Sequence, residues 1–307
     1  MSTVKINLYE LLERLPLNWR DGRINQVLQK KGLFLTKSHY YSVVASSEDI
    51  ANSFEYKEEF PFLETLEGLI DNKLARETLE ELIKCAEPFD PLRRPDPSDI
   101  QQYFWENGSY ERCDAMSLYA FVRKLKPKKI LEIGSGMSSL VSLKALEDNQ
   151  TGSLTCVEPY PGKRIRALHS LGRMELHAMK AQDITPEFLD AELDDGDILF
   201  IDSTHVVKTG SDCVHMYLRL LPQITKKIYV HIHDIFLPKG YPIAWLNQEH
   251  NFWNEQYLLL AWLVDNARTK VLYCSGYNEI RNTDLMEALS HGRYEGMNGG
   301  AVWIEYN

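Results

Sequence analysis

The chain has 307 residues, with 34 basic and 44 acidic side chains and a formal net charge of −10. A protein that grips DNA or RNA without regard to sequence needs a basic surface, so this balance argues against a nucleic-acid partner. No apolar run approaches the roughly 18 residues of a membrane-spanning helix, so no membrane partner is expected. A small-molecule partner remains, and a homo-oligomer is compatible with the sequence.

The five cysteines are scattered along the chain and form no Cys-x-x-Cys pair; they are Cys85, Cys113, Cys156, Cys213 and Cys274. Their odd number and wide spacing favour free thiols over disulfides or a zinc site. Free thiols indicate a reducing compartment, and the charged N-terminal stretch does not resemble a signal peptide. We therefore expect a cytoplasmic protein.

Residues 1–99 are expected to form a mainly helical accessory or cap region. Leucines within 8–15 and apolar residues within 62–86 recur at helical spacing. Between them, Tyr40 and Tyr41 are candidate lid residues over a substrate, although aromatic packing of a helical cap explains them equally well. Four prolines between residues 88 and 97 indicate a boundary, so the second domain is predicted at 100–307.

The second domain alternates strands and helices after a helix that Asp114 is expected to cap and that ends near Leu125. Strands are predicted at 129–133, 153–158, 173–178, 197–202, 227–234, 269–275 and 300–306. Helices are predicted at 138–147, 162–170, 185–192, 209–221 and 250–267. This alternation predicts an α/β fold, in which a largely parallel sheet carries helices on both faces. Ligands of such sheets bind at the carboxyl ends of the strands.

The first strand of this domain ends in a glycine turn. Glu132 precedes Gly134 and Gly136, and the glycines allow a sharp turn and a close approach to a ligand at a helix N-terminus. Nicotinamide and flavin enzymes have a third glycine where this chain has Ser139. Glu158, at the end of the second strand, can accept both ribose hydroxyls of a nucleoside. After the third strand, Asp183 is either an adenine contact or a helix N-cap.

Acids and imidazoles follow the next two strands. Asp202 and His205 come after the fourth strand, and His231, His233 and Asp234 lie at the end of the fifth. Neighbouring carboxylates repel unless a proton or a cation neutralises them, so a divalent metal held by Asp202, His233 and Asp234 is predicted. His205 is a candidate general base, or alternatively a helix cap. We interpret His231 as a core histidine.

Three motifs together resemble class I S-adenosylmethionine-dependent methyltransferases. They are the glycine turn at 132–139, the stretch 200–205 after the fourth strand and the stretch 230–235 at the end of the fifth. They are most similar to the branch of metal-dependent sugar O-methyltransferases of macrolide biosynthesis and the cephalosporin-pathway protein of the same fold. This branch often has Glu at the position of His233. The resemblance covers 100–307 and implies a Rossmann-like, seven-stranded sheet with an antiparallel C-terminal strand. It implies S-adenosyl-L-methionine binding by Glu132, Gly134, Ser135, Gly136, Ser138, Glu158, Asp183 and Asp202.

The leading hypothesis is metal-assisted O-methyl transfer to a hydroxyl of a sugar or natural-product-like molecule, with Mg or Mn as the metal and His205 as base. Candidate substrate contacts are Tyr40, Tyr41, Trp245 and Glu255. An alternative is a non-haem iron oxidative enzyme, in which His205, His233 and one of the two aspartates bind Fe. A third is a nucleoside-binding protein without catalytic activity.

Overall fold

The computed structural model describes residues 22–33, 41–96, 99–296 and 299–307. The chain divides into two compact units, Met1–Ser53 and Phe54–Asn307. The first contains α2 (Gly22–Gln29) and α3 (Ser47–Asn52). A capping box begins α3, because the Asp49 amide donates to Ser46 Oγ and the Ser46 amide donates to the Asp49 carboxylate. The helix predicted within 8–15 lies outside the described residues, as does Tyr40.

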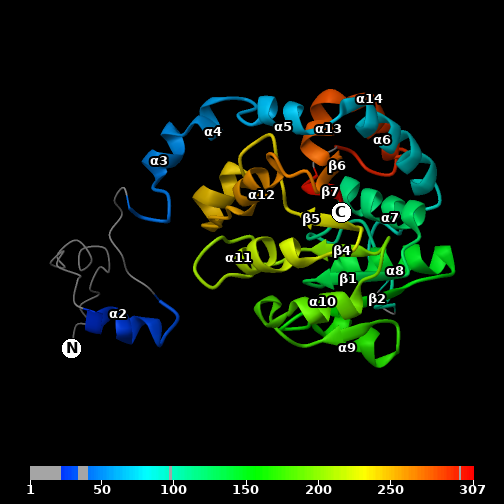
Figure 1. Ribbon diagram of the computed structural model, residues 1–307, viewed down its shortest axis with the longest axis horizontal. Helices are drawn as coiled ribbons and strands as arrows, with labels where there is room; N and C mark the ends of the chain where they lie inside the picture. Colours follow the sequence, from blue (N-terminus) through cyan, green and yellow to red (C-terminus); the bar gives the residue numbers. More distant parts are fainter. Residues whose placement is uncertain (1–21, 34–40, 97–98, 297–298) are drawn as a thin grey trace, which may run out of the picture. The chain divides into compact units, whose positions relative to one another are not determined.

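The second unit is built on a seven-stranded sheet with the order β3-β2-β1-β4-β5-β7-β6 (Figure 1). Its strands are β1 (Lys129–Ile133), β2 (Ser153–Val157), β3 (Glu175–His177), β4 (Ile198–Ile201), β5 (Ile228–His233), β6 (Thr269–Cys274) and β7 (Ala301–Tyr306). The first five strands pair in parallel, and β7 runs antiparallel to both of its neighbours. The predicted Rossmann-like sheet with its antiparallel C-terminal strand is confirmed.

The helices of this unit are α4 (Phe54–Lys57), α5 (Leu63–Leu69), α6 (Asn72–Ala86), α7 (Arg112–Leu125), α8 (Met137–Asn149), α9 (Lys163–Ser170), α10 (Pro186–Glu192), α11 (Asp212–His215), α12 (Glu255–Leu263), α13 (Ser275–Arg281) and α14 (Thr283–Leu289). Alternate strand residues enter opposite apolar layers, since successive side chains of a strand point to opposite faces. Ile130 packs in the layer of α6, α7, α8 and α14, whereas Leu131 packs in the layer of α5, α10 and α12.

Two predicted helices are interrupted. The helix expected over 209–221 begins as α11, continues as a π-helical turn (Met216–Leu220) and ends in a 3-10 turn (Leu221–Gln223). Pro222 has no amide hydrogen to continue an α-helix there. The helix expected over 250–267 is α12 alone, preceded by a π-helical turn (Trp245–Glu249) that ends at His250 in a left-handed conformation.

Two predicted caps are corrected. Glu111 is the N-cap residue of α7, while Asp114 lies buried in its first turn and accepts hydrogen bonds from the Gly300 amide. The N-cap of α10 is Thr185, whose hydroxyl accepts from the Phe188 amide, so Asp183 does not cap that helix. The threonine stands directly before Pro186, a residue well suited to the first helical position.

Helix α6 belongs to the sheet-containing unit. Leu79 and Leu82 are fully buried in the same apolar layer as α7, because an amphipathic helix must cover its apolar stripe. The two compact units therefore meet after Ser53, and not near residue 100. That residues 1–99 and 100–307 have separate roles stays a prediction.

The five cysteines are free thiols. Within the described ranges, every helix is too short or too polar to cross a membrane.

Candidate active site

The glycine turn joins β1 to α8, and its two glycines serve different purposes. Gly134 has φ of +88°, and a Cβ there would overlap the carbonyl oxygen of Asp202 at the end of β4. This glycine is therefore required by the close approach of two neighbouring strand ends. Gly136 is the N-cap residue of α8, and an added Cβ there would meet no atom within 4 Å. The backbone at Gly136 thus borders open space, where a ligand can approach.

Glu132 is a fully buried carboxyl group beside this turn. Its Oε1 accepts hydrogen bonds from the hydroxyls of Ser138 (2.6 Å) and Ser139 (2.8 Å). Among the described residues, its Oε2 and the buried hydroxyl of Ser135 have no partner. Burial raises the pKa of Glu132 to about 8, although the two serine hydroxyls oppose the shift. The turn therefore offers unpaired buried polar atoms to a ligand.

The two other predicted nucleoside contacts lie beyond the carboxyl ends of β2 and β3. Glu158 is half-buried, and its Oε1 accepts a hydrogen bond of 2.7 Å from the amide of Tyr160. Asp183 is exposed at the end of a 3-10 turn (Ala181–Asp183). Because β1, β2 and β3 are parallel, both acids lie beyond the same edge of the sheet as Gly134. Their roles stay predictions.

The predicted acids and one imidazole converge after β4 and β5. His205 Nε2 lies 3.2 Å from Asp202 Oδ1 and 3.5 Å from Asp234 Oδ2. Donor atoms of these three residues lie within 4.8 Å of one another, a spacing that can hold a metal ion. His205 and Asp234 have φ of +58° and +56°, a costly conformation that is concentrated at functional sites. We call these three residues the rim cluster.

The second ring nitrogen of His205 is held by a buried acid from α12. Nδ1 lies 2.8 Å from Oε2 of Glu255, whose Oε1 accepts a hydrogen bond of 2.9 Å from the hydroxyl of Tyr217. Glu255 is fully buried. It was expected among the substrate contacts, but both of its oxygens are engaged by protein groups. His205 does not cap a helix, since Ser211 caps α11.

Asp202 and Glu255 determine the protonation of His205 in the rim cluster. Burial favours a neutral His205, but hydrogen bonds to Asp202 and Glu255 outweigh it and raise its pKa to about 10. Burial also opposes ionisation of Asp202, yet the charge of His233 and the hydrogen bond from His205 hold the pKa of Asp202 below its usual range. Burial raises the pKa of Asp234. Near neutral pH and without a bound metal ion, His205 is therefore protonated.

The two histidines of β5 lie outside the rim cluster. His233, predicted to be a metal ligand, has Nε2 3.6 Å from Asp234 Oδ1, and its ring packs 4.6 Å from that of Tyr110. The structure thus brings His205, rather than His233, together with the two aspartates. His231 is fully buried, and its ring stacks on Phe200 at 4.3 Å. It is a core histidine as expected, although its ring nitrogens have no partner among the described residues.

An aromatic side chain from 250–257, a segment whose aromatic and polar residues predict substrate contacts, covers His205. The ring of Trp253 lies 4.4 Å from the imidazole, and Trp245, a predicted substrate contact, lies 4.9 Å from Trp253. The aromatic content of 250–257 was the available signal for Trp253, whereas nothing in the sequence marked Tyr217. Tyr41 belongs to the unit Met1–Ser53, so its role as a substrate contact stays a prediction.

Comparisons with known proteins bear on the segment that contains this site. Residues 131–235 match a family model described as a methyltransferase domain. A protein of Archaeoglobus fulgidus is 26% identical over 153 residues, which are 49% of this chain and 62% of that relative. The match thus spans less than two thirds of the relative's length.

Solved structures with similarity to this chain include three methyltransferases. The plantazolicin methyltransferase BamL, in complex with a triazolic desmethylPZN analog and SAH, is 15% identical with a TM-score of 0.40, covering 77% of this chain and 99% of that one. The O-methyltransferase TomG from Streptomyces achromogenes is 16% identical with a TM-score of 0.38, covering 75% and 90%. A methyltransferase from Geobacter sulfurreducens is 15% identical with a TM-score of 0.37, covering 64% and 80%.

Proposed function

We propose that this chain, whose residues 131–235 match a methyltransferase-domain model, is a class I S-adenosylmethionine-dependent methyltransferase that transfers a methyl group to a hydroxyl oxygen of a small molecule. The observation that carries the proposal is the imidazole of His205, which is held from one side by the buried Glu255 and faces Asp202 and Asp234 on the other. Methyl transfer to an alcohol needs an aligned acceptor and a group that takes the hydroxyl proton.

The glycine turn fits the methyl donor. The unpaired Oε2 of Glu132 and hydroxyl of Ser135 are polar atoms that a ligand can satisfy, and Gly136 leaves room beside them. When bound, S-adenosyl-L-methionine supplies the methyl group. In our proposal the donor is bound by Glu132, Gly134, Ser135, Gly136, Ser138, Glu158, Asp183 and Asp202.

The rim cluster fits a divalent metal ion by its donor set. The two carboxylates of the rim cluster, Asp202 and Asp234, suit Mg or Mn, which prefer oxygen ligands. In our proposal Asp202 and Asp234 hold the ion, with His233 beside Asp234. A bound divalent ion lowers the pKa of a hydroxyl group and so eases its deprotonation.

His205 acts as the general base in this proposal. Its Nε2 faces the rim, while Glu255 fixes the ring through Nδ1 and Tyr217 in turn holds Glu255. Without a bound ion the pKa of His205 is about 10, so the imidazole must lose a proton before it can act as the base. We further propose that the acceptor is a sugar or natural-product-like molecule and that Trp245 contributes to its site.

An iron-dependent oxidative enzyme is not favoured by this geometry. That chemistry would use two imidazoles and one carboxylate on one face of the metal. In the part of the chain that the structure describes, the convergent set at this edge has one imidazole and two carboxylates. His233 remains outside it, with its ring against Tyr110.

Transfer of a labelled methyl group tests the proposal. The full-length chain, freed of metal with EDTA, is incubated with methyl-labelled S-adenosyl-L-methionine and a panel of sugars and phenols, with and without Mg²⁺ or Mn²⁺. We expect label in one acceptor class. His205→Ala should abolish turnover while leaving donor affinity near that of the unaltered chain. His169→Ala, the same change at an exposed site, should leave both unchanged.

Unchanged turnover in His205→Ala contradicts its assignment as base. Donor binding without transfer to any acceptor would favour a nucleoside-binding protein without catalytic activity. Transfer that is equal with and without the divalent ion contradicts the metal-assisted part of the proposal but leaves methyl transfer standing.

A further inference from the structure

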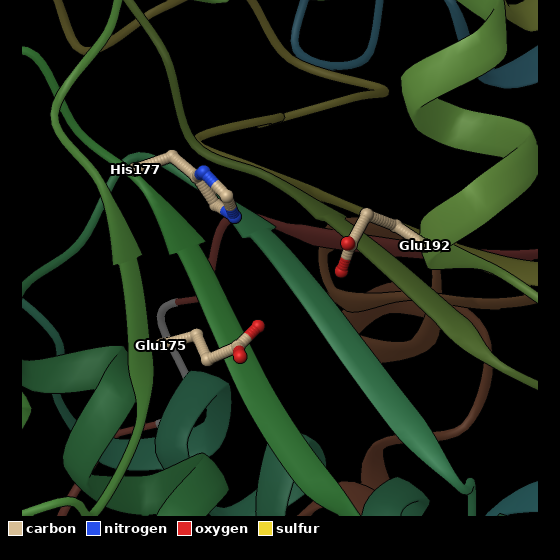
Figure 2. A group of neighbouring side chains, drawn as sticks. All are labelled: Glu175, His177 and Glu192. Carbon is tan, nitrogen blue, oxygen red and sulfur yellow. The ribbon is translucent and has the colours of Figure 1, made fainter.

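A second group of metal-ligating side chains lies beside β3, the outermost strand on one side of the sheet. Figure 2 shows Glu175 and His177 of β3 facing Glu192, the last residue of α10. Donor atoms of these three residues lie within 4.8 Å of one another. Glu175 and His177 are two positions apart on one strand and therefore point to the same face. This group shares no residue with the rim cluster. In the sheet, β2 and β1 lie between β3 and β4, the strand that leads to Asp202 and His205.

The imidazole of His177 has an unpaired, buried nitrogen. Nε2 is inaccessible to solvent and has no hydrogen-bond partner among the described residues. Phe188 of α10 packs against the ring at 5.1 Å with its plane nearly perpendicular, and the ring points toward the two carboxylates in Figure 2. A buried polar atom without a partner is costly, so this arrangement calls for a bound group.

We propose that Glu175, His177 and Glu192 bind a divalent metal ion of the zinc class. Zinc accepts imidazole nitrogen and carboxylate oxygen in one site, and two carboxylates with a neutral imidazole balance its charge. Lys129 Nζ lies 3.0 Å from Oε2 of Glu192, which leaves the other oxygen of this carboxylate to the metal. The ion would join α10 to β3, a three-residue strand with only one neighbour in the sheet.

Zinc binding to a chain with a silenced rim cluster tests this site. Asp202→Asn/Asp234→Asn provides the background, purified without a tag, stripped with EDTA and freed of the chelator. Isothermal titration with ZnCl₂ should then show one ion per chain, and zinc should raise the melting temperature. His177→Gln and Glu192→Gln in that background should each weaken zinc binding roughly tenfold or more, because each loses one of three protein ligands. Glu187→Gln, on the same helix, should not.

The proposal is overturned if the background chain binds no zinc, or if His177→Gln binds it as tightly as the background does. If circular dichroism shows that His177→Gln does not fold, Glu175→Gln at an exposed position takes its place. Zinc binding here does not depend on methyl transfer. Failure of the transfer assay would leave this site standing, and failure of the titration would leave the transferase standing.

Discussion

At the level of single residues, two acids on opposite sides of one imidazole govern the chemistry of the proposed active site. Asp202 lies against Nε2 of His205 and Glu255 against Nδ1. Both acids stabilise the protonated ring, so the pKa of His205 rises to about 10 despite its burial. The contact that orients the base therefore also retains its proton.

Glu255→Gln tests this coupling through the pH dependence of methyl transfer. In the unaltered chain, kcat/KM should rise with pH as the fraction of neutral His205 grows, because both acids favour the protonated ring. Without the Glu255 carboxylate the pKa of His205 should fall, and the profile should move to lower pH. The plateau of kcat should also drop roughly tenfold to a hundredfold, because the ring loses its orientation. A lower rate with an unshifted profile would mean that Glu255 is purely structural.

Glu132→Gln should change how stability depends on pH. The pKa of Glu132 is near 4.5 when unfolded and about 8 in the folded chain, so folding favours the protonated form. Its contribution is fully present below pH 4.5 and is lost as pH rises through 8. The melting temperature of Glu132→Gln should therefore fall less over this interval than that of the unaltered chain. Glu64→Gln, at an exposed position, should follow the unaltered chain; equal slopes for all three would contradict the prediction.

At the level of elements, the site depends on how closely β1 and β4 approach each other. Where the two strands end, the Asp202 amide donates a hydrogen bond to the carbonyl of Ile133 in β1. On the other side of β1, the Gly134 amide donates to the carbonyl of Val157 in β2. The approach leaves no room for a side chain at Gly134. The same strand ends carry Asp202 to the rim cluster and Glu132 to the glycine turn, so one packing contact positions both.

Gly134→Ala and Gly136→Ala separate the two glycines. An alanine at Gly134 must adopt a positive φ and collide with Asp202, so we expect a loss of about 3 kcal/mol or more in the free energy of unfolding. Gly136→Ala meets no protein atom, and it should instead weaken binding of S-adenosyl-L-methionine while changing stability far less. Chemical denaturation and donor titration measure the two effects. Equal stability losses would contradict the distinction.

At the level of the whole molecule, two apolar layers enclose the sheet. Both are formed by buried residues that follow Phe54 in the chain. One layer extends from Leu79 to Trp303 and the other from Leu66 to Tyr306. The unit Met1–Ser53 contributes no member to either layer among the described residues. The stability of the sheet-containing unit should therefore come from its own core.

A chain that begins at Phe54 should retain the cooperative thermal unfolding and the donor affinity of the full chain. Circular dichroism and titration with S-adenosyl-L-methionine measure these properties. If Tyr40 and Tyr41 contact the acceptor as predicted, the KM for the acceptor should rise in the shortened chain. A broad, non-cooperative transition would contradict an independent core, and an unchanged KM would contradict the role of the two tyrosines.

The amino-acid sequence by itself determined the order of strands and helices, the glycine turn, and the placement of Asp202, His205 and Asp234 after neighbouring strands. These features follow from local periodicity and from the rule that parallel strands end at one edge. Only the tertiary structure paired Glu255 with His205, placed the carbonyl of Asp202 against Gly134, and set Glu192 beside His177. Each of these contacts joins distant parts of the chain, and its geometry depends on the angle at which a helix or strand packs, which no local pattern encodes.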